Sequence, residues 1–264
     1  PGVLISLGLA VVGGVVFAMS ERRAVEPIVP LHYLRRRNFA FPIAAQTFSN
    51  FAYIGAFFLA PLLLWHVYGY ANQESKIGLL VLPRPIVFSV IAPVAGYVAV
   101  RVGERTSAVV GTAAVVASMA VFALAPLRGG MLWVEIAFVL SGVGLGVGQP
   151  PLSASVANEF EAEDLGAASA SQQLMNQVGT VAGIQVMQTV QAVAAHGRSS
   201  PAALLPSFHL AYVVGGAVAL FGVLGAACTR STDRKGMTGM GASPAPSAVV
   251  EFGDPQPAVV TPAP

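Results

Sequence analysis

Long apolar runs, separated by short polar segments, dominate the sequence. Each run is about as long as the 20 or so apolar residues that a helix needs to cross a bilayer. The pattern therefore predicts seven membrane-spanning helices in an all-α protein that is embedded in lipid. The expected spans cover approximately residues 3–20, 39–66, 77–100, 106–126, 131–157, 166–193 and 206–228.

Composition supports a protein that lies mostly in lipid. Hydrophobic residues make up 55% of the chain and charged residues 10%, whereas an ordinary soluble domain carries roughly 25% charged residues. A soluble domain could not cover that much apolar surface with groups that water tolerates. The net charge of +2 is too small to indicate a nucleic-acid partner, and the single cysteine, Cys228, excludes a disulfide within the chain.

Three regions follow from the pattern. Residues 1–38 hold one spanning helix and a basic connector, residues 39–228 hold six further helices, and residues 229–264 form a tail. The tail is rich in Pro, Ala, Gly and Ser and cannot bury enough surface to offset its ordering entropy, which predicts disorder. Because the chain begins at Pro1 directly inside an apolar run, we expect a fragment of a longer protein.

The basic residues predict the orientation, because loops on the cytoplasmic side are enriched in Lys and Arg. Ten basic residues fall in alternate loops on one side and three on the other. The first set is Arg22, Arg23, Arg35, Arg36, Arg37, Arg101, Arg105, Arg230, Arg234 and Lys235; the second is Lys76, Arg128 and Arg198. The first side is therefore expected to be cytoplasmic, together with the tail, in a multi-pass protein of the plasma membrane.

Two charged residues lie within predicted spans, where a charge is costly unless it faces protein or water. Arg84 lies between Pro83 and Pro85, which indicates an interrupted helix lining a cavity, and Glu135 lies about one turn into its span. One interpretation makes Glu135 a proton-binding carboxylate and Arg84 its partner or a substrate contact. The alternative is that both side chains extend to the headgroups at the membrane surface.

Polar side chains also form a stripe on the second span. Gln46, Asn50, Tyr53 and Phe57 recur at spacings of four, three and four, so they project from one helical face. The stripe predicts the wall of a substrate cavity. Hydrogen bonding between helices is the alternative, and such bonds contribute about 0.6 kcal/mol each.

Small residues mark two spans for close packing. The sixth span carries Gln177 and the pair Gly179 and Gly183, a GxxxG spacing that lets another helix approach. Several other amides accompany them, of which one or two could face a pathway. The fifth span contains glycines before Pro150, including Gly142 and Gly146, which predict a bendable, closely packed helix. The sequence lacks HExxH, GxSxG and CxxC motifs, so we predict no catalytic site, metal site or cofactor.

The turn after the third span resembles the cytoplasmic-loop motif of the major facilitator superfamily, roughly G-x-x-x-D-R-x-G-x-R. Gly96, Arg101, Gly103 and Arg105 match this motif, whereas Val100 replaces its aspartate. The missing carboxylate argues against the motif's charge-relay role here and leaves its packing and anchoring role.

Further segments resemble the fourteen-helix drug:proton antiporter branch of that superfamily. They are the stretch from Gly142 to Pro151, the stretch from Gly166 to Gly183, and the loop at 26–39. The resemblance implies one linker helix followed by the six-helix C-terminal bundle of a transporter whose N-terminal half is absent. It implies proton-driven export of hydrophobic, often cationic, compounds. A non-transporting membrane sensor or scaffold is the alternative.

Overall fold

The computed structural model describes residues 36–128, 130–160, 165–198 and 200–229, together with five isolated positions between 12 and 20. Within these ranges the chain is helical and contains no strand. The predicted first span, the connector before Arg36 and the tail beyond Thr229 lie almost wholly outside the described residues.

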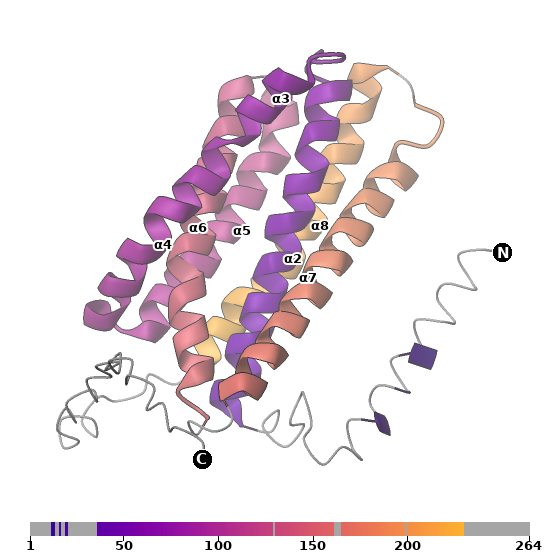
Figure 1. Ribbon diagram of the computed structural model, residues 1–264. Helices are drawn as coiled ribbons and strands as arrows, with labels where there is room; N and C mark the ends of the chain where they lie inside the picture. The colour runs from indigo at the N-terminus through magenta and orange to yellow at the C-terminus, as the bar shows by residue number, and fades with distance from the viewer. Residues whose placement is uncertain are drawn as a thin grey trace, which may run out of the picture. The chain divides into compact units, whose positions relative to one another are not determined.

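The described helices follow the predicted spans closely (Figure 1). They are α2 (Arg37–His66), α3 (Glu74–Val81), α4 (Pro83–Val102), α5 (Glu104–Arg128), α6 (Met131–Ala157), α7 (Leu165–Ala194) and α8 (Pro201–Cys228). The largest boundary difference is at α8, which begins five residues before the predicted start at 206. Its start is favoured by the side chain of Ser200, which accepts a hydrogen bond from the backbone of Ala203, and by proline at the first helical position.

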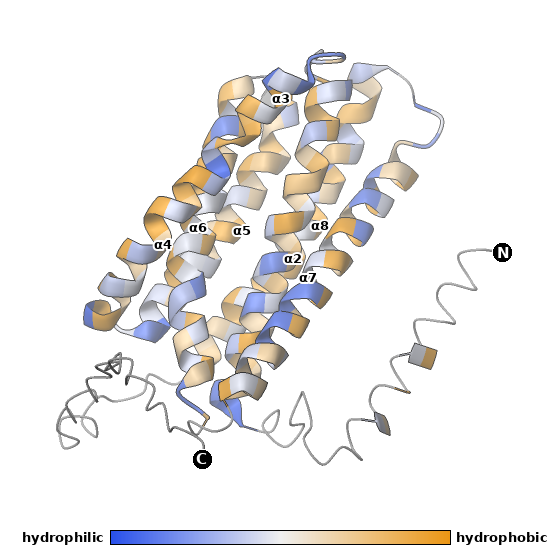
Figure 2. Ribbon diagram, viewed as in Figure 1, coloured by the Kyte–Doolittle hydropathy of each residue, from blue (hydrophilic) through white to orange (hydrophobic). Residues whose placement is uncertain are grey.

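Five helical segments among the described residues are long and apolar enough to cross a membrane: α2, α3 with α4, α5, α6 and α8. The fold is therefore an all-α membrane bundle, as predicted. α7 has 30 residues and packs along α2 and α8, but its amide side chains make it more polar than the other long helices (Figure 2). The span expected at 166–193 is thus a bundle helix of unusual polarity.

The third predicted span is interrupted at Leu82, where α3 ends and α4 begins. Pro83 and Pro85 cause the interruption, because neither has a backbone N–H to donate to the preceding turn. Proline at the first position of a new helix is favourable, so α4 restarts directly. The expected interrupted helix is present, and Arg84 lies in the first turn after the break.

The helices surround a central α2. It packs against α7 and α8 and touches α6, while α5 joins α6 to α8 and α4 covers α6. Within its most apolar stretch 67% of α2 is buried, against 17% of the α3–α4 segment. Figure 1 shows α4 and α7 at opposite edges of the bundle. The polar stripe on α2 is consequently enclosed, and the outer faces of α4 and α7 are open.

Glycines on α6 permit close packing on two sides. Gly142 and Gly146 face α4: a Cβ on Gly142 would lie 2.6 Å from the backbone oxygen of Arg84, and one on Gly146 would lie 3.0 Å from Ile91. Gly144 faces α5, where a Cβ would lie 2.7 Å from the backbone nitrogen of Val115. The contact between α6 and α4 brings Arg84 into the interior of the bundle.

Candidate functional site

Arg84 is the largest fully buried side chain of the described residues, with 0% of its surface exposed. It extends from α4 to α2, where its guanidinium donates a hydrogen bond to the backbone carbonyl of Tyr53. The guanidinium also lies over the ring of Tyr53. Its Cζ atom is 3.4 Å from the centre of the Tyr53 ring and 5.1 Å from the centre of the Phe57 ring. Two aromatic rings and one carbonyl thus stabilise the cation on one side.

The rest of this guanidinium has no partner among the described residues. Nε and Nη1 are buried and donate to no hydrogen-bond acceptor, and no ion pair joins Arg84 to Glu135 within the described ranges. The predicted pairing of these two residues is therefore not seen among the described residues. The burial of the Arg84 side chain within the bundle does not match the alternative that it extends to the membrane surface. A buried cation without a counterion costs stability.

Glu135 lies in the second turn of α6 and is partly buried. Its Oε1 atom is buried and has no hydrogen-bond partner among the described residues. A carboxylate in this setting can gain or lose a proton without breaking an ion pair.

Gln46 and Asn50, from the stripe on α2, belong to a hydrogen-bond network between helices. Gln172 of α7 donates to Oε1 of Gln46 over 2.8 Å and to Oγ of Ser153 on α6 over 2.6 Å. Asn50 donates to Oδ1 of Asn176 over 3.1 Å. Both bonds between α2 and α7 join residues 126 positions apart, so the two helices run in the same direction. These two residues are enclosed between helices, which matches the interhelical alternative.

Sequence reasoning did not identify Ser153 or the pairing of Gln172 with Gln46. One signal was available: Gln172 and Asn176 repeat the spacing of four that separates Gln46 from Asn50. Amides at matching spacings on two helices can pair, but nothing in the sequence fixes which helices are neighbours.

α7 has two different faces. Gly179 and Gly183 lie against α2, since a Cβ on either would overlap the backbone of Thr47 or Phe51. The opposite face exposes the amides of Gln173, Gln177 and Gln185 along a shallow hollow of about 820 Å³, together with Val178 and Val181. Gln177 was expected to pack between helices, and the structure instead exposes it on this face.

The turn between α4 and α5 carries the residues of the loop motif. Arg101 lies over the ring of Tyr97 and donates to its hydroxyl group. Gly103 has a φ of 102°, which a side chain would strain. Glu104 accepts a hydrogen bond from Ser155 of α6 over 3.0 Å, so a carboxylate four positions after Val100 ties this turn to the bundle.

Two other motif residues are less engaged. A Cβ on Gly96 would lie 3.8 Å from Pro150 of α6, which is ordinary contact, and Arg105 is exposed at the first turn of α5.

At the other end of the bundle Tyr68 donates to the carbonyl of Ala125 over 3.1 Å. Burial raises the pKa of the Tyr68 phenol above its ordinary value.

Long apolar helices enclosing a buried arginine and an amide network define a multi-pass membrane protein with a polar interior. The chain belongs to the Major Facilitator Superfamily, whose family model matches residues 3–184. It is therefore a member of a transporter family and not an enzyme.

Curated relatives carry names from drug resistance. The chain is 24% identical over 69% of its length to the Multidrug transporter protein MdtP of Bacillus subtilis and 26% identical over 72% to the Multidrug resistance protein Stp of Mycobacterium tuberculosis. It is 30% identical over 70% to the Tetracenomycin C resistance and export protein of Streptomyces glaucescens. The matched regions cover 33%, 35% and 34% of these relatives, so the chain spans about a third of their length.

Proposed function

We propose that this chain is the C-terminal half of a proton-coupled exporter of hydrophobic or cationic drugs in the plasma membrane, with its tail in the cytoplasm. The names of the relatives support drug export, and their greater length supports a second, N-terminal half as partner. Export would follow from rocking of the two halves around a cavity at the midplane of the membrane.

The exposed face of α7 carries this proposal. Gln173, Gln177 and Gln185 lie on a helix of 30 residues that is long enough to cross the bilayer. Amides facing hydrocarbon without partners are unfavourable, so this face must border protein or water. A hollow of about 820 Å³ with three amides and two valines fits the wall of a pathway for amphipathic compounds, which the second half would close.

The group of Tyr53, Phe57 and Arg84 is the proposed interior contact for substrates. Phe57 offers apolar surface at the edge of this group, and the buried, unpartnered guanidinium atoms would offer hydrogen bonds once movement of the bundle uncovers them. The amide network of Gln46 and Asn50 would set the position of α2 relative to α6 and α7. In this proposal the network orients the wall and does not itself touch the substrate.

Glu135 is the proposed proton-coupling residue of this half. Its carboxyl group, with one buried and unpartnered oxygen, can alternate between charged and neutral forms as the bundle moves.

At the opposite end of the bundle, the turn with Gly96, Arg101, Gly103 and Arg105 is proposed to anchor α4 to α5 during rocking, with Glu104 as its link to α6.

Efflux of a lipophilic cation dye tests the proposal. We expect an efflux-deficient host that carries the complete transporter to retain less ethidium when energised, and an uncoupler to restore retention. Glu135→Gln should reduce the component of efflux that the pH gradient drives by about tenfold, the change that a loss of about 1.4 kcal/mol produces. Glu159→Gln, at a partly exposed glutamate just after α6, is the control and should leave gradient-driven efflux intact.

Two outcomes would contradict the proposal. Dye retention that neither the transporter nor the uncoupler alters would contradict drug export and favour a sensor or scaffold. Full gradient dependence in the Glu135→Gln variant would remove Glu135 from the coupling step and leave export itself in place.

A further inference from the structure

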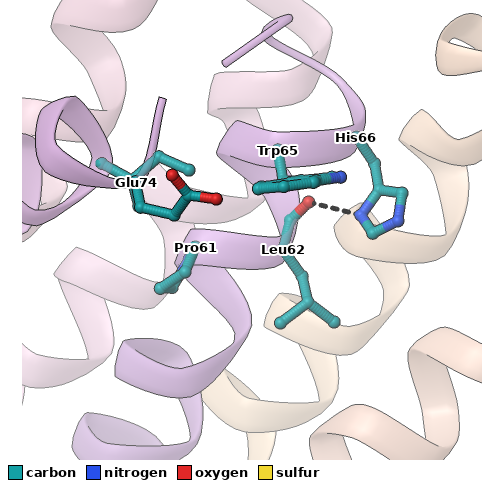
Figure 3. A pocket seen from close by; sticks show the side chains of 6 residues that line it. Pro61, Leu62, Trp65, His66 and Glu74 are labelled. Atoms are coloured by element: carbon teal, nitrogen blue, oxygen red, sulfur yellow. Dashed lines mark hydrogen bonds between the residues drawn. The ribbon is translucent and has the colours of Figure 1, made fainter. Parts of the chain in front are cut away.

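A pocket opens where α2 ends and α3 begins. It has a volume of about 350 Å³ and is lined by Pro61, Leu62, Trp65, His66, Glu74 and Ile77. Figure 3 shows the carboxylate of Glu74 pointing toward the indole of Trp65. The indole is partly buried, whereas the side chain of Glu74 is exposed. A carboxylate and an aromatic side chain thus line the same space of ligand size.

The lining of this pocket favours a cation. An indole face attracts cations through its quadrupole, and a carboxylate adds an opposite charge. Neither Lys nor Arg is among the lining residues. His66 also lines the pocket: its Nδ1 lies 2.9 Å from the carbonyl oxygen of Leu62 on its own helix, and its ring lies on the far side of Trp65 from Glu74 in this view (Figure 3).

A second pocket, called the inner pocket below, adjoins the first, called the outer pocket, and offers apolar surface. Its volume is about 290 Å³, and it shares Pro61 and Ile77 with the first pocket. The remaining lining residues are Phe57, Gly78, Val81, Leu82 and Pro85. All of these side chains are apolar, so the second pocket suits the hydrocarbon part of a ligand.

Arg84 sets the direction in which a ligand would lie. The ring of Phe57 forms part of the inner pocket, and the Arg84 guanidinium lies 5.1 Å from the centre of that ring. A fixed positive charge so close repels a ligand cation from the inner pocket. The charge of the ligand is then most stable at the outer pocket, beside Glu74 and Trp65.

We propose that these two adjoining pockets form a binding site for an organic cation with an apolar body. This site shares Phe57 with the interior group of Tyr53, Phe57 and Arg84 but holds the charge of the ligand away from Arg84. The cationic head contacts Glu74 and Trp65, and the body occupies the inner pocket lined by Phe57 and Val81. The site rests on the proposed drug export and adds to it a second binding position, at the periphery of the bundle, for positively charged substrates. Binding to it needs neither the second half nor a proton gradient.

Tryptophan fluorescence tests this site directly. The chain has two tryptophans, Trp65 and Trp133, so the Trp133→Phe variant reports on Trp65 alone. Benzyltrimethylammonium, added to this variant in detergent, should change the Trp65 emission with saturation. Benzenesulfonate, an anion of similar size, should bind far more weakly. Glu74→Gln should weaken binding of the cation about fivefold, as expected for the loss of a partly exposed charge pair of about 1 kcal/mol.

Lys76→Gln is the matched control, because Lys76 is also exposed on α3 and has the opposite charge. Its removal should leave cation binding unchanged or slightly stronger. Equilibrium dialysis of labelled benzyltrimethylammonium with the parent chain and the Glu74→Gln variant repeats the comparison without altering Trp133. Equal responses to the cation and the sulfonate, or an unchanged affinity in Glu74→Gln, would overturn the site. Binding without dye efflux would contradict only the proposed transport, and efflux without binding would contradict only this site.

Discussion

Replacing Arg84 by methionine should lower drug efflux by about tenfold or more, equivalent to about 1.4 kcal/mol, while leaving the protein at least as stable as the parent. The reason is the unbalanced environment of this cation. The guanidinium lies against the rings of Tyr53 and Phe57 and donates to one backbone carbonyl. Its other two nitrogen atoms are buried and have no hydrogen-bond partner among the described residues. Replacing buried charges by apolar residues of similar volume is often neutral or stabilising by about 1–4 kcal/mol.

The measurement pairs thermal unfolding in detergent with initial rates of dye efflux. Arg198→Met is the control, because Arg198 is exposed between α7 and α8 and its loss should change neither quantity. If Arg84→Met lowers the melting temperature sharply and prevents accumulation, the arginine is needed for folding and its proposed role as a substrate contact fails. Efflux at the parent rate in a stable Arg84→Met variant would also remove Arg84 from the pathway.

Gly183→Ala should destabilise the bundle by about 1–3 kcal/mol, the usual cost of forcing an added group into a well-packed interior. A Cβ at this position would overlap the backbone of Phe51, and the nearest atoms belong to main chain that cannot rotate away. α2 and α7 would have to separate, which also strains the hydrogen bonds of Gln46 and Asn50 with α7. We expect a lower melting temperature and less protein in the membrane.

Gly166→Ala is the matched control on the same helix, because no atom lies within 4 Å of a Cβ placed there. Alanine is also the better helix former, by roughly 0.5–1 kcal/mol within a helix, so this variant should be as stable as the parent or slightly more stable. Similar melting temperatures for Gly183→Ala and Gly166→Ala would contradict the close contact between α2 and α7.

Helix positions could be predicted from the sequence because each depends on a local property. Apolar runs of membrane length fix where helices form, and the prolines around Arg84 fix where one is interrupted. The loop residues Arg101 and Gly103 could likewise be identified from the sequence, because they belong to a local motif. α7 is the partial exception: its length was predictable, but whether its amides face protein or water depends on neighbours that the sequence does not name.

Contacts between helices were not predictable to the same degree. The stripe of Gln46, Asn50, Tyr53 and Phe57 is a single face in the sequence, yet it divides between two environments. Its first two residues bond to α6 and α7, and its last two stack with Arg84 of α4. Helical periodicity identifies a shared face, but the rotation and neighbours of the helix decide what each part of that face meets.

Crossing of the membrane by this bundle underlies every functional proposal above, and labelling of single cysteines tests it most directly. Ala71 precedes α3 and Arg105 lies in the first turn of α5; both are exposed, and α3 with α4 lies between them. In a Cys228→Ser background, a membrane-impermeant maleimide should label Ala71→Cys in intact cells and Arg105→Cys only after permeabilisation. Labelling of both positions in intact cells, or of neither, would contradict a bundle that spans the bilayer.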